Sequence, residues 1–349
     1  MKTNNTTSEY LNIVKIYEDK YKSDSLNNDV KFIVLYQVGT FFEMYSAIEN
    51  DPRLVEVTTI LNIILSKSNK NIENVSKSNP AMAGIPIHTL NKYLKLLIDN
   101  NYIVITYIQS PDNIKKRILN KIYTSSSYIE DETINHNNNL FSIYIETFKQ
   151  EIFIGISIIN TITGEVSITE LYNNDINKII EDIHKLLIIF KAKEFIINIS
   201  KDETIENKIT NNLINKTINK INNSINQLTN NYNTKPNVFI KYLIKENINI
   251  NYQIQFLNKI YENKVENANY LLESFNIDRN EFARISLVSA LEYIYNCDNT
   301  IIKYLDKPKK IINEEYLNLH NNALYQLNVL STSNKENTNS RISIFFITS

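Results

Sequence analysis

The hydrophobic residues near the N-terminus first recur at helical intervals and then join into a continuous run. The helical spacing covers residues 7–22 and is carried by Tyr10, Ile13, Val14, Tyr17 and Tyr21. The run VKFIVLYQVG that follows predicts a strand ending at Gly39. The next segment, TFFEMYSAIEN, predicts a helix with Thr40 as its N-cap. The stretch VGTFFEMY is therefore expected to be a strand-to-helix corner.

The remaining apolar pattern up to residue 124 predicts a compact α/β unit. Residues 51–65 predict a helix that runs into a strand, IILSKSN, and residues 67–79 predict a polar loop. The segment PAMAGIP holds two of the six prolines and one of the four glycines, which predicts a fixed turn. HTLNKYLKLLIDNN has one apolar face and predicts a helix, and YIVITYIQ predicts a buried strand.

A second unit is predicted over residues 140–262, after a linker at 125–139 with the polar composition SSSYIEDETINHNNN. LFSIYIETF, EIFIGISIIN and SITEL predict three consecutive antiparallel strands, with a Thr-Gly turn before the third. A helix, DINKIIEDIHKLLIIFK, and a strand, EFIINI, follow. The order β-β-β-α-β is typical of an RNase H-like α+β layer. From residue 201 to 262 the sequence is rich in Asn, Ile and Lys and only weakly helical.

Residues 263–349 predict a partial helical region. The clearest helix in it is NEFARISLVSALEYIYNC, which places Phe282, Ile285, Val288 and Leu291 on one stripe. The chain as a whole therefore reads as multidomain, with an α/β unit at 1–124, an α+β unit at 140–262 and the start of a helical unit after it.

Composition and charge narrow the class of protein. Of 349 residues, 43% are hydrophobic and 21% charged, which is typical of globular domains. The net charge is −1, but the first 124 residues carry about +3 by count, so a local basic surface remains compatible with the average. The single cysteine, Cys297, excludes an internal disulfide and a cysteine zinc cluster. With no signal segment and no apolar run of 18 residues, an intracellular, soluble protein is expected.

Four segments, in this order and spacing, resemble the DNA mismatch repair protein family MutS. LYQVGTFFEMY is similar to the family's strand, Gly, Phe-x-Glu segment, and NPAMAGIPIHTLNKYLKLLIDNNYIVITYIQ to its Met-Ala-Gly-(Ile/Val)-Pro-x-His helix and strand. NTITGEVSITEL resembles the Ser-Thr-Gly-Glu hairpin of the connector domain. LLESFNI, the helix after it and YLNLHNNALYQLNVL resemble the opening of the lever domain. The resemblance implies a mismatch-recognition domain, an RNase H-like connector and a truncated lever.

The resemblance also has departures and one large absence. Gln37 stands where the family usually has Arg, Thr40 where it has Asp, and TSSS at 124–127 where it has Pro-Gly-Thr. No Gly-x-x-x-x-Gly-Lys-(Ser/Thr) loop occurs, and four glycines cannot build a phosphate-cradling loop. The chain is therefore expected to be non-catalytic and to bind no cofactor. ATP and Mg²⁺ would belong to the family's ATPase domain, which is expected to be absent.

The resemblance implies a wedge for double-stranded DNA that carries mispairs or small loops. Phe41 would insert from the minor groove at a weakened base step, and Glu43 would hydrogen-bond the displaced base. Lys67 and Lys70 would contact phosphates and set the position of the DNA without reading its sequence. Core packing at a corner explains Phe42, and it is the competing explanation for Phe41.

Two other functions are compatible with the sequence. The chain could be a fragment or split-gene product that acts only as an interaction subunit, beside a separate polypeptide carrying clamp and ATPase domains. The RNase H-like pattern also suggests a second hypothesis, a nuclease in which Glu146, Glu151 and Glu165 would be metal ligands. The hairpin pattern gives no reason for these three carboxylates to converge, so the nuclease is the least favoured.

Overall fold

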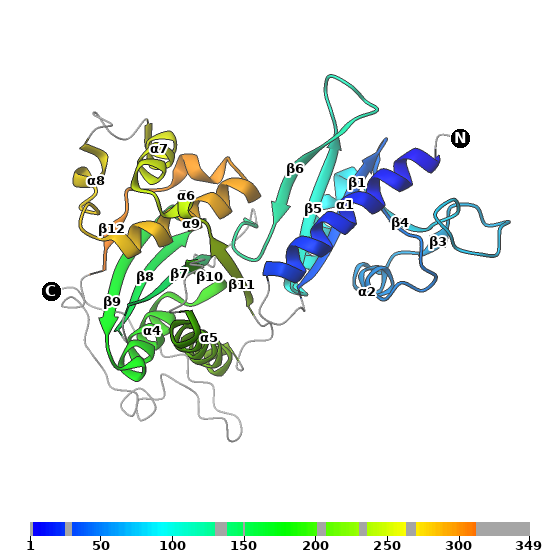
Figure 1. Ribbon diagram of the computed structural model, residues 1–349. Helices are drawn as coiled ribbons and strands as arrows, with labels where there is room; N and C mark the ends of the chain where they lie inside the picture. Colours follow the sequence, from blue (N-terminus) through cyan, green and yellow to red (C-terminus); the bar gives the residue numbers. More distant parts are fainter. Residues whose placement is uncertain are drawn as a thin grey trace, which may run out of the picture. The chain divides into compact units, whose positions relative to one another are not determined.

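The computed structural model describes residues 3–24, 30–129, 138–148, 151–200, 207–229, 236–262 and 270–311. The fold is α/β, with two six-stranded sheets that each have helices on both faces (Figure 1). The strands of the first sheet are β1 (Lys31–Val38), β2 (Phe41–Ser46), β3 (Ser66–Lys67), β4 (Ala81–Pro86), β5 (Tyr102–Gln109) and β6 (Arg117–Tyr123). Their order is β3-β4-β2-β1-β5-β6, and β1 pairs parallel with β5 but antiparallel with β2.

Helices cover the two faces of the first sheet because its strands carry apolar side chains on both sides. These helices are α1 (Thr3–Asp24), α2 (Pro52–Leu61), the short η1 (Ile87–Thr89) and α3 (Leu90–Asp99). The tyrosines of α1 pack on Phe32, Val34 and Tyr36, which point to one face. Leu35 and the other alternate residues of β1 point to the opposite face, against α2 and α3.

The second sheet contains the β-β-β-α-β order expected from the sequence. Its strands are β7 (Asn139–Phe148), β8 (Glu151–Asn160), β9 (Val166–Asn173), β10 (Ala192–Ser200), β11 (Asn237–Leu243) and β12 (Lys309–Lys310). They lie in the order β11-β10-β7-β8-β9-β12, with β7, β8 and β9 as an antiparallel meander and β10 parallel to β7. Assigning this sheet to a connector domain stays a prediction.

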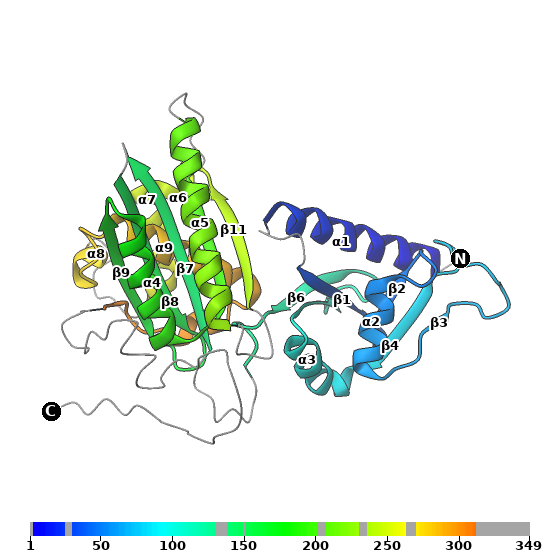
Figure 2. The same cartoon turned by 90° about the horizontal axis from the view of Figure 1, so that it is seen from below.

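The helices around the second sheet divide between its two faces. They are α4 (Ile176–Phe190), α5 (Asn207–Thr229), α6 (Lys245–Ile248), α7 (Ile250–Tyr261), α8 (Leu271–Ser274), α9 (Glu281–Cys297) and the short η4 (Ile301–Tyr304). Figure 2 shows α4 and α5 over one face. α9 packs on the other, where Leu287 and Leu291 share a core with Leu140 and Ile159 of the sheet. The helix predicted for the third region thus forms one core with the second sheet.

Two predicted elements are wrong. Residues 41–46 form strand β2, not a helix, because Gly39 and Thr40 make a two-residue turn that folds β2 back on β1. Gly39 has φ +60°, the conformation that the first position of such a turn requires. PAMAGIP is not a turn but strand β4, flanked by Pro80 and ending at Pro86. Both prolines lie at the strand's limits, where a missing N–H costs least.

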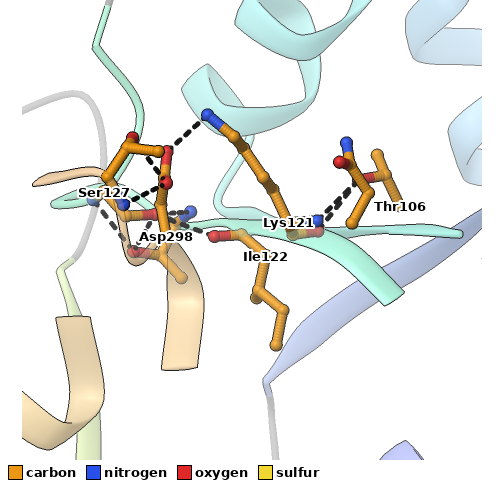
Figure 3. A network of polar contacts seen from close by, with 8 residues as sticks. Thr106, Lys121, Ile122, Ser127 and Asp298 are labelled. Atoms are coloured by element: carbon orange, nitrogen blue, oxygen red, sulfur yellow. Dashed lines mark hydrogen bonds and ion pairs between the residues drawn. The ribbon is translucent and has the colours of Figure 1, made fainter. Parts of the chain in front are cut away.

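Polar contacts tie the end of β6 to the residues after α9. Lys121 of β6 forms an ion pair with Asp298 at 2.6 Å (Figure 3). Although burial opposes it, hydrogen bonds from Lys121 and Thr300 lower the pKa of Asp298 below its ordinary value. Ser127 Oγ donates to the Ile122 carbonyl at 3.0 Å, which closes the turn that follows β6.

Candidate nucleic-acid interface

Strand β2 presents Phe41 to solvent and Phe42 to the core because successive strand residues point to opposite faces. Phe41 is 44% exposed, whereas Phe42 is 2% exposed. Phe41 lies opposite Val38 of β1 and Pro86 of β4, so its backbone is held at one end of the sheet by strands on both sides. Strand pairing on both sides of β2 therefore fixes the backbone position of this exposed aromatic residue.

Glu43 shares the face of Phe41, two residues further along β2. Its cross-strand neighbours are Tyr36 of β1 and Gly84 of β4. Gly84 has no side chain, and a Cβ there would lie 3.5 Å from Cγ of Glu43 and 3.2 Å from the Phe42 carbonyl oxygen. No side chain of residue 84 therefore covers the side of Glu43 that faces β4.

The hydroxyl of Tyr45 donates to Oε2 of Glu43, and no other donor to this carboxylate occurs among the residues with described placement. Burial, and then the hydrogen bond to Glu43, raise the pKa of Tyr45 well above its ordinary value, so the hydroxyl keeps its proton. Tyr45 in turn packs edge-on against Tyr10 of α1, with ring centroids 5.3 Å apart. Glu43 is therefore oriented by a packed tyrosine and keeps a second oxygen for another donor.

The hairpin between β5 and β6 brings basic residues to the same end of the sheet as Phe41. β1 and β5 are parallel, so the last residue of β1 and the start of this hairpin lie at one edge. Gln37 connects them: its Oε1 accepts from the Gln109 amide at 2.9 Å, and its carbonyl accepts from Nε of Arg117 at 3.1 Å. Figure 1 shows the hairpin loop extending beyond the strands.

The tip of this hairpin carries exposed charge beside an exposed apolar residue. Lys115 and Lys116 are exposed, and Ile114 is 71% exposed. Arg117 lies 5.2 Å from the centre of the Tyr36 ring and is partly buried, so it supports the hairpin as well as adding charge. Sequence reasoning missed these residues, although the run Lys115-Lys116-Arg117 was visible as a signal.

Lys67 and Lys70, the predicted phosphate contacts, lie at the other end of the sheet. Lys67 is opposite Ala81, whereas Phe41 is opposite Pro86, five residues along β4. At about 3.4 Å per residue this separates them by roughly 17 Å. Nζ of Lys67 donates to the Glu73 carbonyl and lies 3.9 Å from Glu49; Lys70 is exposed in the loop after β3. The structure does not bring either lysine to Phe41.

The described part of the chain contains no group of three or more His, Cys, Asp or Glu side chains placed to hold a metal ion. Glu146 and Glu151 lie on β7 and β8 near the end where Phe148 pairs with Glu151, whereas Glu165 follows the opposite end of β8. The strand β8 therefore separates the carboxylates of the nuclease hypothesis. None of the helices with described placement is long and apolar enough to cross a membrane.

A comparison with known protein families matches the part of the chain that contains the first sheet. A family model described as MutS domain I matches residues 20–132. The N-terminal domain of this chain belongs to the MutS family. The match contains Phe41, Glu43 and the hairpin bearing Lys115 and Lys116.

Individual relatives extend the MutS likeness over more of the chain. A putative DNA mismatch repair protein mutS homolog of Acanthamoeba polyphaga mimivirus is 27% identical over 335 residues, which cover 90% of this chain and 29% of the relative. The DNA mismatch repair proteins MutS of Fervidobacterium nodosum and Finegoldia magna are each 33% identical, over 172 and 187 residues. Those matches cover 48% and 51% of this chain. The chain thus spans 29% of the viral relative and 18% and 20% of the bacterial ones.

Among solved structures, Thermus thermophilus RuvC in complex with a Holliday junction substrate aligns with 45% of this chain and 93% of its own. The TM-score is 0.27 and the identity 7%, which is too low to support an argument.

Proposed function

We propose that this chain recognises mismatched double-stranded DNA in DNA mismatch repair, with Phe41 as a wedge in the minor groove. The observation that carries the proposal is the exposed ring of Phe41, fixed between two strands in a domain of the MutS family. A mispair stacks poorly, so inserting a ring and bending the duplex there costs less than at a matched step. The preference for a mispair then comes from the difference in deformation energy between a mispaired step and a matched step.

Glu43 is proposed to hydrogen-bond the base that Phe41 displaces. It lies on the same face as Phe41, beside Gly84, which has no side chain, and Tyr45 donates to one of its oxygens. A carboxylate near phosphates is electrostatically unfavourable, so its place at this site requires a compensating donor. A displaced base edge supplies one.

The β5–β6 hairpin is proposed to hold the DNA backbone next to the wedge. Lys115 and Lys116 are exposed at the edge that Phe41 occupies, which suits contacts to phosphates on either side of a kinked step. Lys67 and Lys70 could contact only DNA that continues along the sheet, several base pairs from Phe41.

No catalytic step by these 349 residues is needed for this function. They contain no Gly-x-x-x-x-Gly-Lys-(Ser/Thr) loop, so any ATP hydrolysis with Mg²⁺ coupled to recognition would be carried by a domain outside them. A second polypeptide with clamp and ATPase domains is a proposed partner. The alternative, an interaction subunit that binds no DNA itself, is separated from the first proposal by the following experiment.

The test compares binding to a duplex of about 30 base pairs with a central G·T pair or unpaired base against the matched duplex, by fluorescence anisotropy. The wild-type chain should prefer the mispaired duplex, and Phe41→Ala should lower that preference about tenfold, which is about 1.4 kcal/mol. Glu43→Ala should lower it too, whereas Glu43→Gln, which can still accept a hydrogen bond, should retain more of it.

Ile48→Ala is the matched control, since Ile48 is also an exposed apolar residue of this domain. It should leave the preference unchanged. Equal affinity for both duplexes in the wild-type chain, or a preference that survives in Phe41→Ala, would contradict the wedge.

A further inference from the structure

Four aromatic rings form a stack on the second sheet that begins in the core and ends at the surface. The ring centroids of Tyr144 and Phe282 are 6.3 Å apart, those of Phe282 and Phe153 5.0 Å, and those of Phe153 and Tyr172 4.9 Å. Tyr144 is fully buried, whereas Tyr172 is 56% exposed. Tyr172, on strand β9, is therefore the terminal ring and offers an aromatic face to solvent.

Carboxylates lie along this stack. Glu146 of β7 lies directly opposite Phe153, and Glu151 lies on the same face of β8 as Phe153, two residues away. The hydroxyl of Tyr144 donates to Glu146 at 2.7 Å, and a hydrogen bond to Glu151 raises the pKa of Tyr172. Glu281, at the start of α9, adds a third carboxylate next to Phe282.

The charge of Arg284 interacts favourably with Glu281, but Glu146 and Glu151 have no ion-pair partner in the part of the chain that the structure describes. None of its Lys or Arg side chains forms an ion pair with Glu146, Glu151 or Glu281. Glu170, on the same face, has a different role: it accepts from the Ala283 amide at 2.9 Å and from Asn280, and so fixes the start of α9. Among the described residues, the exposed ring of Tyr172 therefore lies beside two carboxylates, Glu146 and Glu151, that have no ion-pair partner.

We propose that this surface, defined by Tyr172, Phe153, Glu146 and Glu151, binds an arginine-containing segment of a partner protein. A guanidinium is planar, so it stacks on a ring face while its N–H groups form paired hydrogen bonds with a carboxylate. Neighbouring positions on one strand face are about 7 Å apart, which suits one arginine spanning ring and carboxylate. Lysine offers only a compact charge and fits this surface less well. The negative charge excludes the DNA backbone as the occupant.

The test uses the full chain and two fluorescein-labelled peptides that are identical except that three arginines in one are lysines in the other, in 150 mM salt. Anisotropy should show binding of the arginine peptide that is at least about threefold tighter than that of the lysine peptide. Tyr172→Ala and Glu151→Gln should each weaken arginine-peptide binding about two- to fivefold, the range that exposed cation–π and ion-pair contacts give.

Two control variants distinguish binding at this surface from nonspecific attraction of the peptide to negative charge elsewhere on the chain. Tyr304→Ala removes another exposed tyrosine, and Glu181→Gln removes an exposed carboxylate of α4. Both variants should bind the arginine peptide like wild type. Phe41→Ala should do so too, so this proposal can fail while the proposed role of Phe41 in DNA recognition stands, and the reverse. Equal affinity for both peptides, or no effect of Tyr172→Ala, would overturn it. Self-association that Tyr172→Ala abolishes would also overturn it, by assigning the surface to a second copy of the chain.

Discussion

Glu194 of strand β10 is a carboxylate with no exposed surface, surrounded by donors. The Thr124 hydroxyl donates to it at 2.8 Å, the Ser126 amide at 3.3 Å and the Tyr293 hydroxyl at 3.0 Å; the Ser126 hydroxyl donates as well. These donors favour the charged form, but burial outweighs them and raises the pKa of Glu194 above its ordinary value. The folded chain therefore holds a proton on Glu194 more tightly than the unfolded chain does.

Glu194→Gln should change how stability depends on pH. Because the folded-state pKa of Glu194 is raised, its contribution to the free energy of unfolding is fully present below about pH 4.5, the ordinary glutamate value, and falls as pH rises toward the folded-state pKa. Glutamine does not titrate. The free energy of unfolding of wild type minus that of Glu194→Gln should therefore decrease with rising pH above 4.5, measured by urea denaturation.

Glu194→Ala is the harsher variant, because it leaves the buried donors of Thr124, Ser126 and Tyr293 without an acceptor. It should lower the free energy of unfolding by about 2 kcal/mol or more. Glu181→Gln, at an exposed position, should change it by less than about 0.5 kcal/mol at every pH. A wild-type advantage over Glu194→Gln that grows with pH would contradict the assigned direction of the pKa shift.

The sequence predicts the location of some residues of the candidate interface but not of others. The assignment of Phe42 to the core agrees with the structure, and the exposure of Phe41 allows the predicted role without testing it. Lys115 and Lys116 were missed because their nearness to Phe41 depends on the pairing of β1 with β5, some 70 residues apart in sequence. Cys297 is buried, and burial raises its pKa well above the ordinary thiol value.

At the scale of elements, α9 lies unusually close to the second sheet because small residues face each other. Ser142 and Ser286 exchange hydrogen bonds between side chain and carbonyl, at 2.9 and 2.7 Å. Gly155 of β8 completes the contact: a Cβ there would lie 1.9 Å from the Phe282 carbonyl oxygen. Helix and sheet backbones are therefore in direct contact at this position.

Gly155→Ala should destabilise the chain strongly, since a methyl group would have to displace the backbone of α9. A loss of about 3 kcal/mol or more is expected, measured by denaturant unfolding. Gly84→Ala is the matched control in the first sheet, where the added Cβ would have a closest contact of 3.2 Å. It should cost clearly less. Equal losses for the two variants would contradict the close approach of α9 to β8.

Whole elements were predicted best where the apolar pattern was long. α1, α3 and the meander β7–β9 match their patterns, since many residues agree on one period. β2 was mistaken for a helix because its six residues start with three large side chains that fit either period, and the Gly39-Thr40 turn decides between them. β6 was missed, because its outer residues are mostly exposed and show no alternation of apolar side chains.

The net charge of the whole chain does not show that the proposed DNA-binding part of it is basic. The net charge is −1, yet the first 124 residues are basic, and two pairs of their lysines lie at opposite ends of one sheet. Lys115 and Lys116 share the edge of Phe41, whereas Lys67 and Lys70 lie at the far end. With so few cations, DNA binding by the isolated chain should be micromolar or weaker at physiological salt.

The dependence of DNA affinity on salt tells the two pairs of lysines apart. Each phosphate neutralised contributes about −0.9 to the slope of the logarithm of the binding constant against the logarithm of salt concentration. Replacing both Lys115 and Lys116 by Ala should therefore make this slope shallower by about 2 and weaken binding to matched and mispaired duplexes alike, because phosphate contacts carry no sequence information. The double variant of Lys67 and Lys70 should change the slope by less than half as much. Both pairs are at the surface, so thermal unfolding of the variants should match wild type. If the Lys67 and Lys70 variant alone flattened the slope, the DNA would have to run along β3 and β4, and the hairpin at β5–β6 would have no part in holding it.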